Sequence, residues 1–142
     1  MYLNRTIVHA SNKEASAIFT GEPLGLPPPH HAGPFATVQV DAELSLDFMD
    51  TGGTTRPQHY AFLVTEAEFG AIFARVRERG VTCWADSHRR EAGLINTWDD
   101  GHGVYFDDPK GHLLEVITCP YGSGGTTTQS PNPLFTSETA DA

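Results

Sequence analysis

The stretch that decides the fold is residues 103–116, which read GVYFDDPKGHLLEV. Residues 103–106 and 113–118 are apolar runs with the composition of β-strands. Between them, residues 108–111 (Asp-Pro-Lys-Gly) are typical of a tight turn, because proline presets its own φ and glycine accepts a positive φ. The stretch therefore predicts two strands joined by a turn near the end of the folded part of the chain.

Working outward from this hairpin, a repeat links the two halves of the sequence. Residues 5–11 and 59–65 are both short, mostly apolar runs that end in a hydroxyl residue. The tripeptide Ala-Ile-Phe occurs at residues 17–19 and again at 71–73, with the same spacing of 54 residues. A spacing that is kept through a strand and a helix indicates two equivalent halves.

Each half is expected to begin with a strand followed by a capped helix. Ser11 with Glu14, and Thr65 with Glu68, have the spacing of a capping box. The second helix has one apolar face, which consists of Phe69, Ile72, Phe73 and Val76. Gly80 is the predicted end of this helix.

The remaining strands are predicted from composition. In the first half the helix should close near residues 21–23, and a Pro/Gly loop should occupy residues 27–34. A hairpin is expected at residues 35–40 and 44–49. In the second half a further strand is expected at residues 82–85.

The composition changes near the C-terminus. From residue 122 onward glycine, serine, threonine and proline dominate without periodicity, which predicts a flexible tail over residues 122–142. We therefore expect one folded domain over residues 1–121, with modules at about 3–50 and 57–119.

Composition and charge exclude several classes of protein. The 142 residues (15.4 kDa) are 39% hydrophobic, and eighteen acidic against nine basic residues give a net charge of −9. Such a charge argues against binding to nucleic acid or anionic membranes, and no apolar run approaches the length of a membrane helix. Cys83 and Cys119 are too few for a disulfide scaffold, so we expect reduced thiols in a cytoplasmic protein.

Residues 103–116 resemble the closing signature of the vicinal oxygen chelate superfamily. This superfamily comprises glyoxalases, bleomycin-resistance proteins, fosfomycin-resistance thiol transferases and extradiol dioxygenases. Residues 58–64 (QHYAFLV) resemble the opening strand of its module, and the resemblance covers about residues 3–120. It implies an α+β fold of two βαβββ modules whose curled sheets form a cup, either within one chain or across a swapped dimer.

The resemblance also implies a metal site. In metal-binding members the first strand of a module gives a histidine and the last strand a glutamate, and His59 and Glu115 match these positions. Zn, Ni, Mn or Fe would suit this donor pair. Strand alternation places Tyr60 and Phe62 against the helix, and therefore His59 on the other face. His112, in the turn before Glu115, is assigned a structural role.

The first module departs from the pattern. The 54-residue spacing puts Arg5 opposite His59, and Asp47 stands opposite Glu115. An arginine is not a usable metal ligand. Either Arg5 pairs with Asp47 and the site binds metal weakly or not at all, or His9, four residues along the same strand, supplies a ligand. We expect Arg5, Asp47, His59 and Glu115 to converge on one cavity.

Two functions from different classes follow. In the first, the protein is a metal-dependent lyase or dioxygenase acting on a small molecule with adjacent oxygens, with Asp47 as the proton acceptor. In the second, it is a non-catalytic protein that sequesters a drug or antibiotic, for which the acidic charge would favour a cationic ligand. In either case a homodimer is expected, since curled sheets leave exposed edges.

Overall fold

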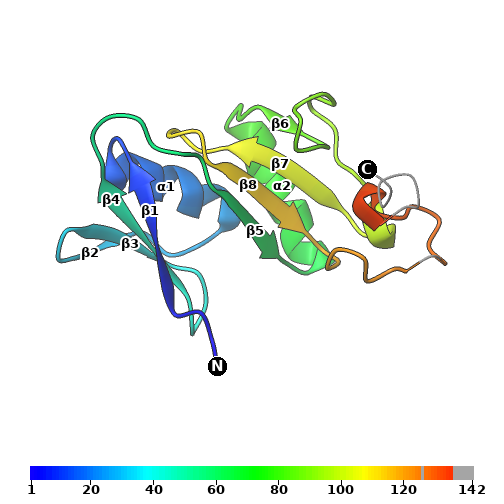
Figure 1. Cartoon of the computed structure of the whole chain (residues 1–142), viewed down its shortest axis with the longest axis horizontal. Coiled ribbons are helices and arrows are strands. Elements are labelled where there is room, and N and C mark those ends of the chain that lie inside the picture. Colours follow the sequence, from blue (N-terminus) through cyan, green and yellow to red (C-terminus); the bar gives the residue numbers. More distant parts are fainter. Residues whose placement is uncertain (126, 136–142) are drawn as a thin grey trace. The chain divides into compact units, whose positions relative to one another are not determined.

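The computed structural model describes residues 1–125 and 127–135. These residues form two α-helices and two four-stranded sheets, which belong to two compact units. The first unit consists of Met1–Gln58 together with Asp107–His112, and the second of His59–Phe106 together with the chain from Leu113 onward. Figure 1 shows that each unit is a sheet with one helix lying against it.

The first unit has the element order βαβββ. Its elements are β1 (Arg5–Ala10), α1 (Lys13–Leu24), β2 (His30–Ala32), β3 (Phe35–Gln39) and β4 (Ser45–Asp50). The sheet order is β1-β4-β3-β2, with β1 and β4 parallel and the other neighbours antiparallel. Helix α1 packs on the face whose buried side chains include Val8, Ala10, Ala36, Val38, Leu46 and Phe48.

The second unit repeats this order. Its elements are β5 (His59–Leu63), α2 (Glu66–Glu78), β6 (Cys83–Trp84), β7 (Gly103–Asp107) and β8 (Leu113–Ile117), followed by a short 3₁₀ turn at Pro133–Phe135. The sheet order is β5-β8-β7-β6, and β5 and β8 are parallel, as β1 and β4 are in the first unit. The predicted α+β fold of two βαβββ modules is therefore confirmed.

The strand register confirms the equivalence of the halves residue by residue. In the first sheet Ile7 lies opposite Asp47. In the second sheet Ala61 lies opposite Glu115. Ala61 follows Ile7 by the same 54 residues that separate the repeated segments, so the two parallel strand pairs have the same alignment.

The helix starts differ from one another. The capping box of Thr65 and Glu68 is present as predicted, with both reciprocal hydrogen bonds at 3.1 Å. The box predicted at Ser11 is wrong, because helix α1 begins one residue later. There Asn12 is the N-cap, and its side-chain oxygen accepts from the Ala15 N–H at 3.1 Å.

Two further boundaries in the first unit are corrected. Helix α1 continues through Pro23 to Leu24, and Gly25 ends it with a left-handed conformation (φ 72°). The predicted loop at residues 27–34 contains the short strand β2. The composition of this loop gives no strand signal. Strand β2 forms because it lies at the edge of the sheet, where pairing with β3 on one side is sufficient.

Among the described residues, neither helix is long and apolar enough to cross a membrane. Both cysteines have free thiols, and burial raises the pKa of the Cys83 thiol. The predicted domain boundaries and the flexibility of the tail stay predictions. Residues 126 and 136–142 of that tail lie outside the described residues.

Candidate functional site

The contact between His59 and Glu115 is the centre of the candidate site in the second unit. The His59 Nε2 atom lies 3.1 Å from the Glu115 Oε1 atom. The Glu115 side chain is 2% exposed and that of His59 is 44% exposed. The Glu115 carboxylate is therefore buried, and it contacts the His59 imidazole, which solvent can reach. The predicted pair of residues is together in the structure.

Two tyrosines complete the surroundings of the carboxylate. The Tyr121 hydroxyl donates to Glu115 Oε2, and the Tyr105 hydroxyl is hydrogen bonded to that of Tyr121. Burial, and next the hydrogen bonds with the Glu115 carboxylate, raise the pKa of Tyr105, and burial and Glu115 likewise raise that of Tyr121. Both phenols therefore keep their protons at neutral pH and serve as hydrogen-bond donors.

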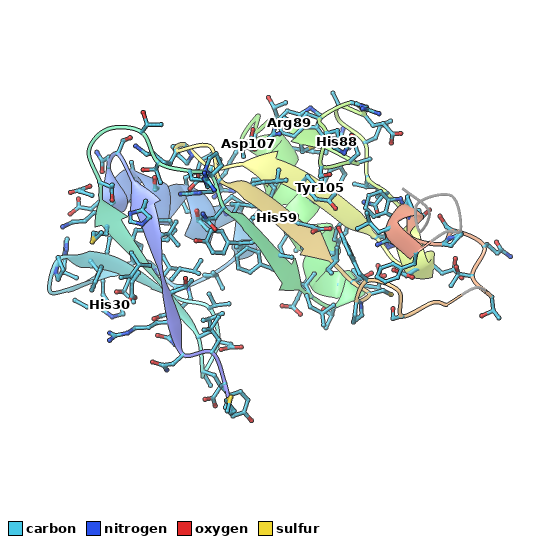
Figure 2. The ribbon with its side chains drawn as sticks, in the orientation of Figure 1. His30, His59, His88, Arg89, Tyr105 and Asp107 are labelled. Atoms are coloured by element: carbon cyan, nitrogen blue, oxygen red, sulfur yellow. The ribbon has the colours of Figure 1, made fainter. Side chains whose placement is uncertain are left out.

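Aromatic rings surround this chain of hydroxyls. The Trp98 ring packs edge-on against Tyr105 and Tyr121, with centroids 6.2 and 6.3 Å apart, and the His59 and Tyr105 centroids are 5.9 Å apart. Figure 2 shows His59 and Tyr105 on the face of the sheet away from helix α2. The other tryptophan, Trp84, lies under the guanidinium of Arg89.

The donor atoms of His59 and Glu115 fit a divalent metal. Two ligand atoms that each lie about 2.1 Å from one ion, at a right angle, are about 3.0 Å apart. The observed 3.1 Å between Nε2 and Oε1 is close to this value, and Tyr121 orients the carboxylate as the outer neighbours of metal ligands do. Within the described residues no cluster of three or more His, Cys, Asp or Glu forms a metal site, so the fit rests on this pair.

The equivalent positions of the first unit have different surroundings. Arg5 and Asp47 line one open hollow of about 550 Å³. Asp47 is buried, and its carboxylate accepts hydrogen bonds from the hydroxyls of Thr37 (3.0 Å) and Ser45 (3.2 Å). In this described part of the chain the predicted ion pair of Arg5 with Asp47 is absent. The predicted ion pair does not form: both hydroxyls donate to the same oxygen of Asp47, Oδ1, and Arg5 is exposed at the strand end.

Two histidines of the first unit, His9 and His112, form hydrogen bonds within that unit. The His9 Nδ1 atom lies 2.7 Å from the Thr51 hydroxyl. The fully buried His112 accepts from the Gln58 N–H at Nδ1 (2.9 Å), so its Nε2 carries the proton and donates to the His9 carbonyl (2.8 Å). His112 therefore has the structural role expected of it. The role of His9 as a ligand stays a prediction.

The structure thus unites His59 with Glu115 and places Arg5 beside Asp47 along one hollow, while the convergence of all four residues stays a prediction. Sequence reasoning missed Tyr121 altogether. The signal that could have indicated such a partner was the position of Glu115 between Leu113 and Ile117 on its strand face. A buried carboxylate requires a hydrogen-bond donor.

The family of this chain follows from comparison with known proteins. The sequence model of the Glyoxalase/Bleomycin resistance protein/Dioxygenase superfamily matches residues 5–116. The chain belongs to this superfamily. Among curated members of the superfamily, the chain is similar to the glutathione transferase FosA of Serratia marcescens, at 31% identity over 123 residues, which are 80% of this chain and 78% of FosA.

Two solved structures of the superfamily are more similar to this chain. Oxidase ChaP-H1 shares 56% identity with a TM-score of 0.83, covering 87% of this chain and 99% of the ChaP-H1 chain. Oxidase ChaP-H2 shares 52% identity with a TM-score of 0.84, covering 88% of this chain and 98% of the ChaP-H2 chain.

Proposed function

We propose that this protein is a metal-dependent oxidase of the superfamily, acting on a small molecule that presents adjacent oxygen atoms. The observation that carries the proposal is the 3.1 Å contact between His59 Nε2 and Glu115 Oε1, which fits one divalent ion. The identity of 56% and 52% to two chains named oxidases supports oxidation over the thiol transfer named for FosA.

A metal at this pair would supply a Lewis acid with open positions for two neighbouring oxygens of a substrate. The chain itself supplies orientation. Tyr121 holds the second oxygen of Glu115, Tyr105 holds the Tyr121 hydroxyl in turn, and Trp98 packs against both rings. Because both phenols keep their protons, Tyr105 donates to the Tyr121 hydroxyl and Tyr121 donates to Glu115, so the chain of hydroxyls fixes the orientation of the carboxylate.

The first module contributes untested roles to the proposal. Asp47 is assigned as the proton acceptor and Arg5 as the cation that balances anionic groups. His9 is assigned as an additional ligand or a pocket-wall residue. Zn, Ni, Mn and Fe remain the candidate metals, because a mixed nitrogen and oxygen donor set suits all four.

Calorimetric titration with Mn²⁺, Ni²⁺, Zn²⁺ and anaerobic Fe²⁺ tests the metal site. We expect His59→Ala and Glu115→Gln each to abolish binding seen in the parent. His102→Ala is the matched control, since His102 also contacts a glutamate, Glu66, at 2.6 Å but lies outside the site. Oxygen uptake by the metal-loaded protein with catechol-type substrates then tests oxidation. A parent that binds none of these ions, or variants that bind as the parent does, would refute the proposal.

A second candidate is a binding protein that sequesters a small molecule without catalysis. The observation that favours it is Arg5, which stands where the second module has the ligand His59. Under this alternative the purified protein contains no stoichiometric metal, and a cationic ligand binds equally well before and after treatment with a chelator.

We also infer a cytoplasmic homodimer. Support for the dimer comes from one face of β5, where His59, Ala61 and Leu63 are exposed, with Leu63 at 61%. The two free thiols suit a reducing compartment. Light scattering at high micromolar concentration tests assembly: a mass of twice 15.4 kDa is expected, and a monomer would contradict it.

A further inference from the structure

A turn in the second unit holds two consecutive aspartates in an uncommon backbone conformation. In the 3₁₀ turn Trp98–Asp100, Asp99 has φ 58° and Asp100 has φ 59°. L-residues with a side chain avoid this left-handed region, although aspartate tolerates it better than most, and such conformations concentrate where the surrounding structure demands them. The proposed metal site does not explain this turn.

The two carboxylates of the turn bind the backbone of the segment that follows β8. Asp99 is 6% exposed, and its two oxygens accept from the N–H groups of Gly122 (3.0 Å) and Gly124 (3.1 Å). The carboxylate of Asp100 accepts instead from Gln129 (3.3 Å) and Ser130 (3.0 Å). The carboxylate contacts are therefore divided, with the Asp99 carboxylate on the near part of the segment and the Asp100 carboxylate on the far part. The Asp99 N–H also donates to the Ser130 carbonyl (2.7 Å).

The near part leaves little room for a larger residue. A Cβ atom at Gly124 would overlap the Thr128 side chain and lie 3.2 Å from the Asp99 Cα atom, and one at Gly122 would lie 3.2 Å from the ring of Phe135. Gly122 also has φ 77°. The glycines thus have a steric and a conformational reason to be where Asp99 binds them.

Gly122 directly follows Tyr121, the residue whose hydroxyl donates to Glu115. We propose that Asp99 is a positioning residue that seats Tyr121 on Glu115 by binding the N–H groups of Gly122 and Gly124. A segment rich in glycine and serine has a large conformational entropy to lose on ordering. Two charge-assisted hydrogen bonds accepted by one buried carboxylate offset part of that entropy cost. Without them, the single hydrogen bond of Tyr121 to Glu115 would have to offset all of it.

The first test needs no metal. In a Trp84→Phe background, Trp98 is the remaining tryptophan, and its fluorescence reports contact with the Tyr121 ring. Asp99→Gly removes the carboxylate and still suits a positive φ. We expect it to increase acrylamide quenching of Trp98 and hydrogen exchange at the Gly122 amide. Asp99→Asn, which also tolerates this φ and keeps one acceptor oxygen, should restore part of the protection.

Asp100→Gly is the matched control, because it makes the same backbone change one residue along and removes instead the carboxylate bonds to the N–H groups of Gln129 and Ser130. Far-ultraviolet circular dichroism and urea unfolding establish that each variant is folded. Equal quenching in Asp99→Gly and the parent would overturn the proposal, as would equal increases in Asp99→Gly and Asp100→Gly.

A second test rests on the proposed metal function. Outer neighbours of metal ligands typically contribute about 10- to 100-fold to affinity, so Tyr121→Phe and Asp99→Gly should each weaken Ni²⁺ binding by about tenfold or more. If Asp99 acts through Tyr121, the double variant should bind no more weakly than Tyr121→Phe alone. Additive losses would overturn the positioning role. A parent that binds no Ni²⁺ would count against the proposed function, and the fluorescence and exchange results would still decide the role of Asp99.

Discussion

The parallel strand pairs β1–β4 and β5–β8 have the same register and different chemistry. In the second pair His59 contacts Glu115, whereas in the first Arg5 and Asp47 occupy the equivalent positions without an ion pair. The glutamate is held by an imidazole and a phenol, and the aspartate by two hydroxyls. The same strand register in the two modules therefore fixes the positions of the side chains but not their binding partners.

The buried faces of the same strands remain alike. Leu46 on β4 and Leu114 on β8 stand at equivalent positions, and each is 3% exposed. The two modules thus differ on the face that carries the candidate site and agree on the face that packs on the helix. The predictions below test this contrast.

The largest effects are expected from the two buried leucines. Leu46→Ala and Leu114→Ala should each lower the free energy of unfolding by about 2–5 kcal/mol, because both leave a cavity in a packed core. Urea unfolding measures both, and Leu94→Ala, at a side chain that is 57% exposed, is the control with almost no expected change. Strongly unequal losses at the two leucines would break the equivalence of the cores.

Making the second module like the first should abolish the metal binding proposed for His59 and Glu115. His59→Arg replaces a neutral donor by a cation that cannot coordinate, so Ni²⁺ affinity should fall by about 100-fold or more. The partial exposure of His59 leaves room for the longer side chain. Calorimetry measures the loss, His102→Arg controls for the added charge, and unchanged affinity in His59→Arg would show that the metal is held elsewhere.

Making the first module like the second should have a smaller and opposite effect. On the predicted convergence of Arg5 with His59 and Glu115, Arg5→His removes a positive charge from the proposed site and adds a nitrogen donor, so Ni²⁺ affinity should rise by about tenfold. Arg56→His makes the same chemical change at another exposed position of the first unit. Should both variants bind metal as the parent does, Arg5 is not the group that weakens the site.

The smallest effect concerns the helix starts. In α2 the hydrogen bonds with the Thr65 backbone and side chain lower the pKa of Glu68, so the unfolded chain binds a proton more readily. The resulting stabilisation is present above the ordinary glutamate pKa of about 4.3 and is lost as the pH falls through the lowered value. Glu68→Gln should therefore reduce stability at pH 7 and have less effect at pH 3, whereas an equal reduction at both values would refute this origin.

The sequence predicts the fold well where its signal is periodic. The 54-residue spacing identifies β1 with β5, and the box at Thr65 identifies the start of α2. It fails at β2 and at Asn12, where a neighbouring strand or a one-residue shift decides the structure. Propensity cannot register such tertiary choices.

The candidate site was predictable in its ligands but not in its supports. His59 and Glu115 follow from the motif and from strand alternation. Tyr121 does not, because it directly precedes the low-complexity segment that begins at Gly122, and Gly122 is bound by Asp99, more than twenty residues earlier. Three-dimensional contacts give this tyrosine its place: its own with Glu115, Tyr105 and Trp98, and that of the Asp99 carboxylate with the neighbouring Gly122.

Residues Asp107–His112, the turn at the heart of the fold signature, belong to the first unit although they join two strands of the second. During synthesis, the N–H of Gln58 and the carbonyl of His9 must therefore wait for His112, which is 103 residues beyond His9. Contacts so distant along the chain form late and slow folding. The half that leaves the ribosome first is thus completed only when most of the second half has also been made, and cutting the chain after residue 58 would yield an unfinished unit instead of an independent module.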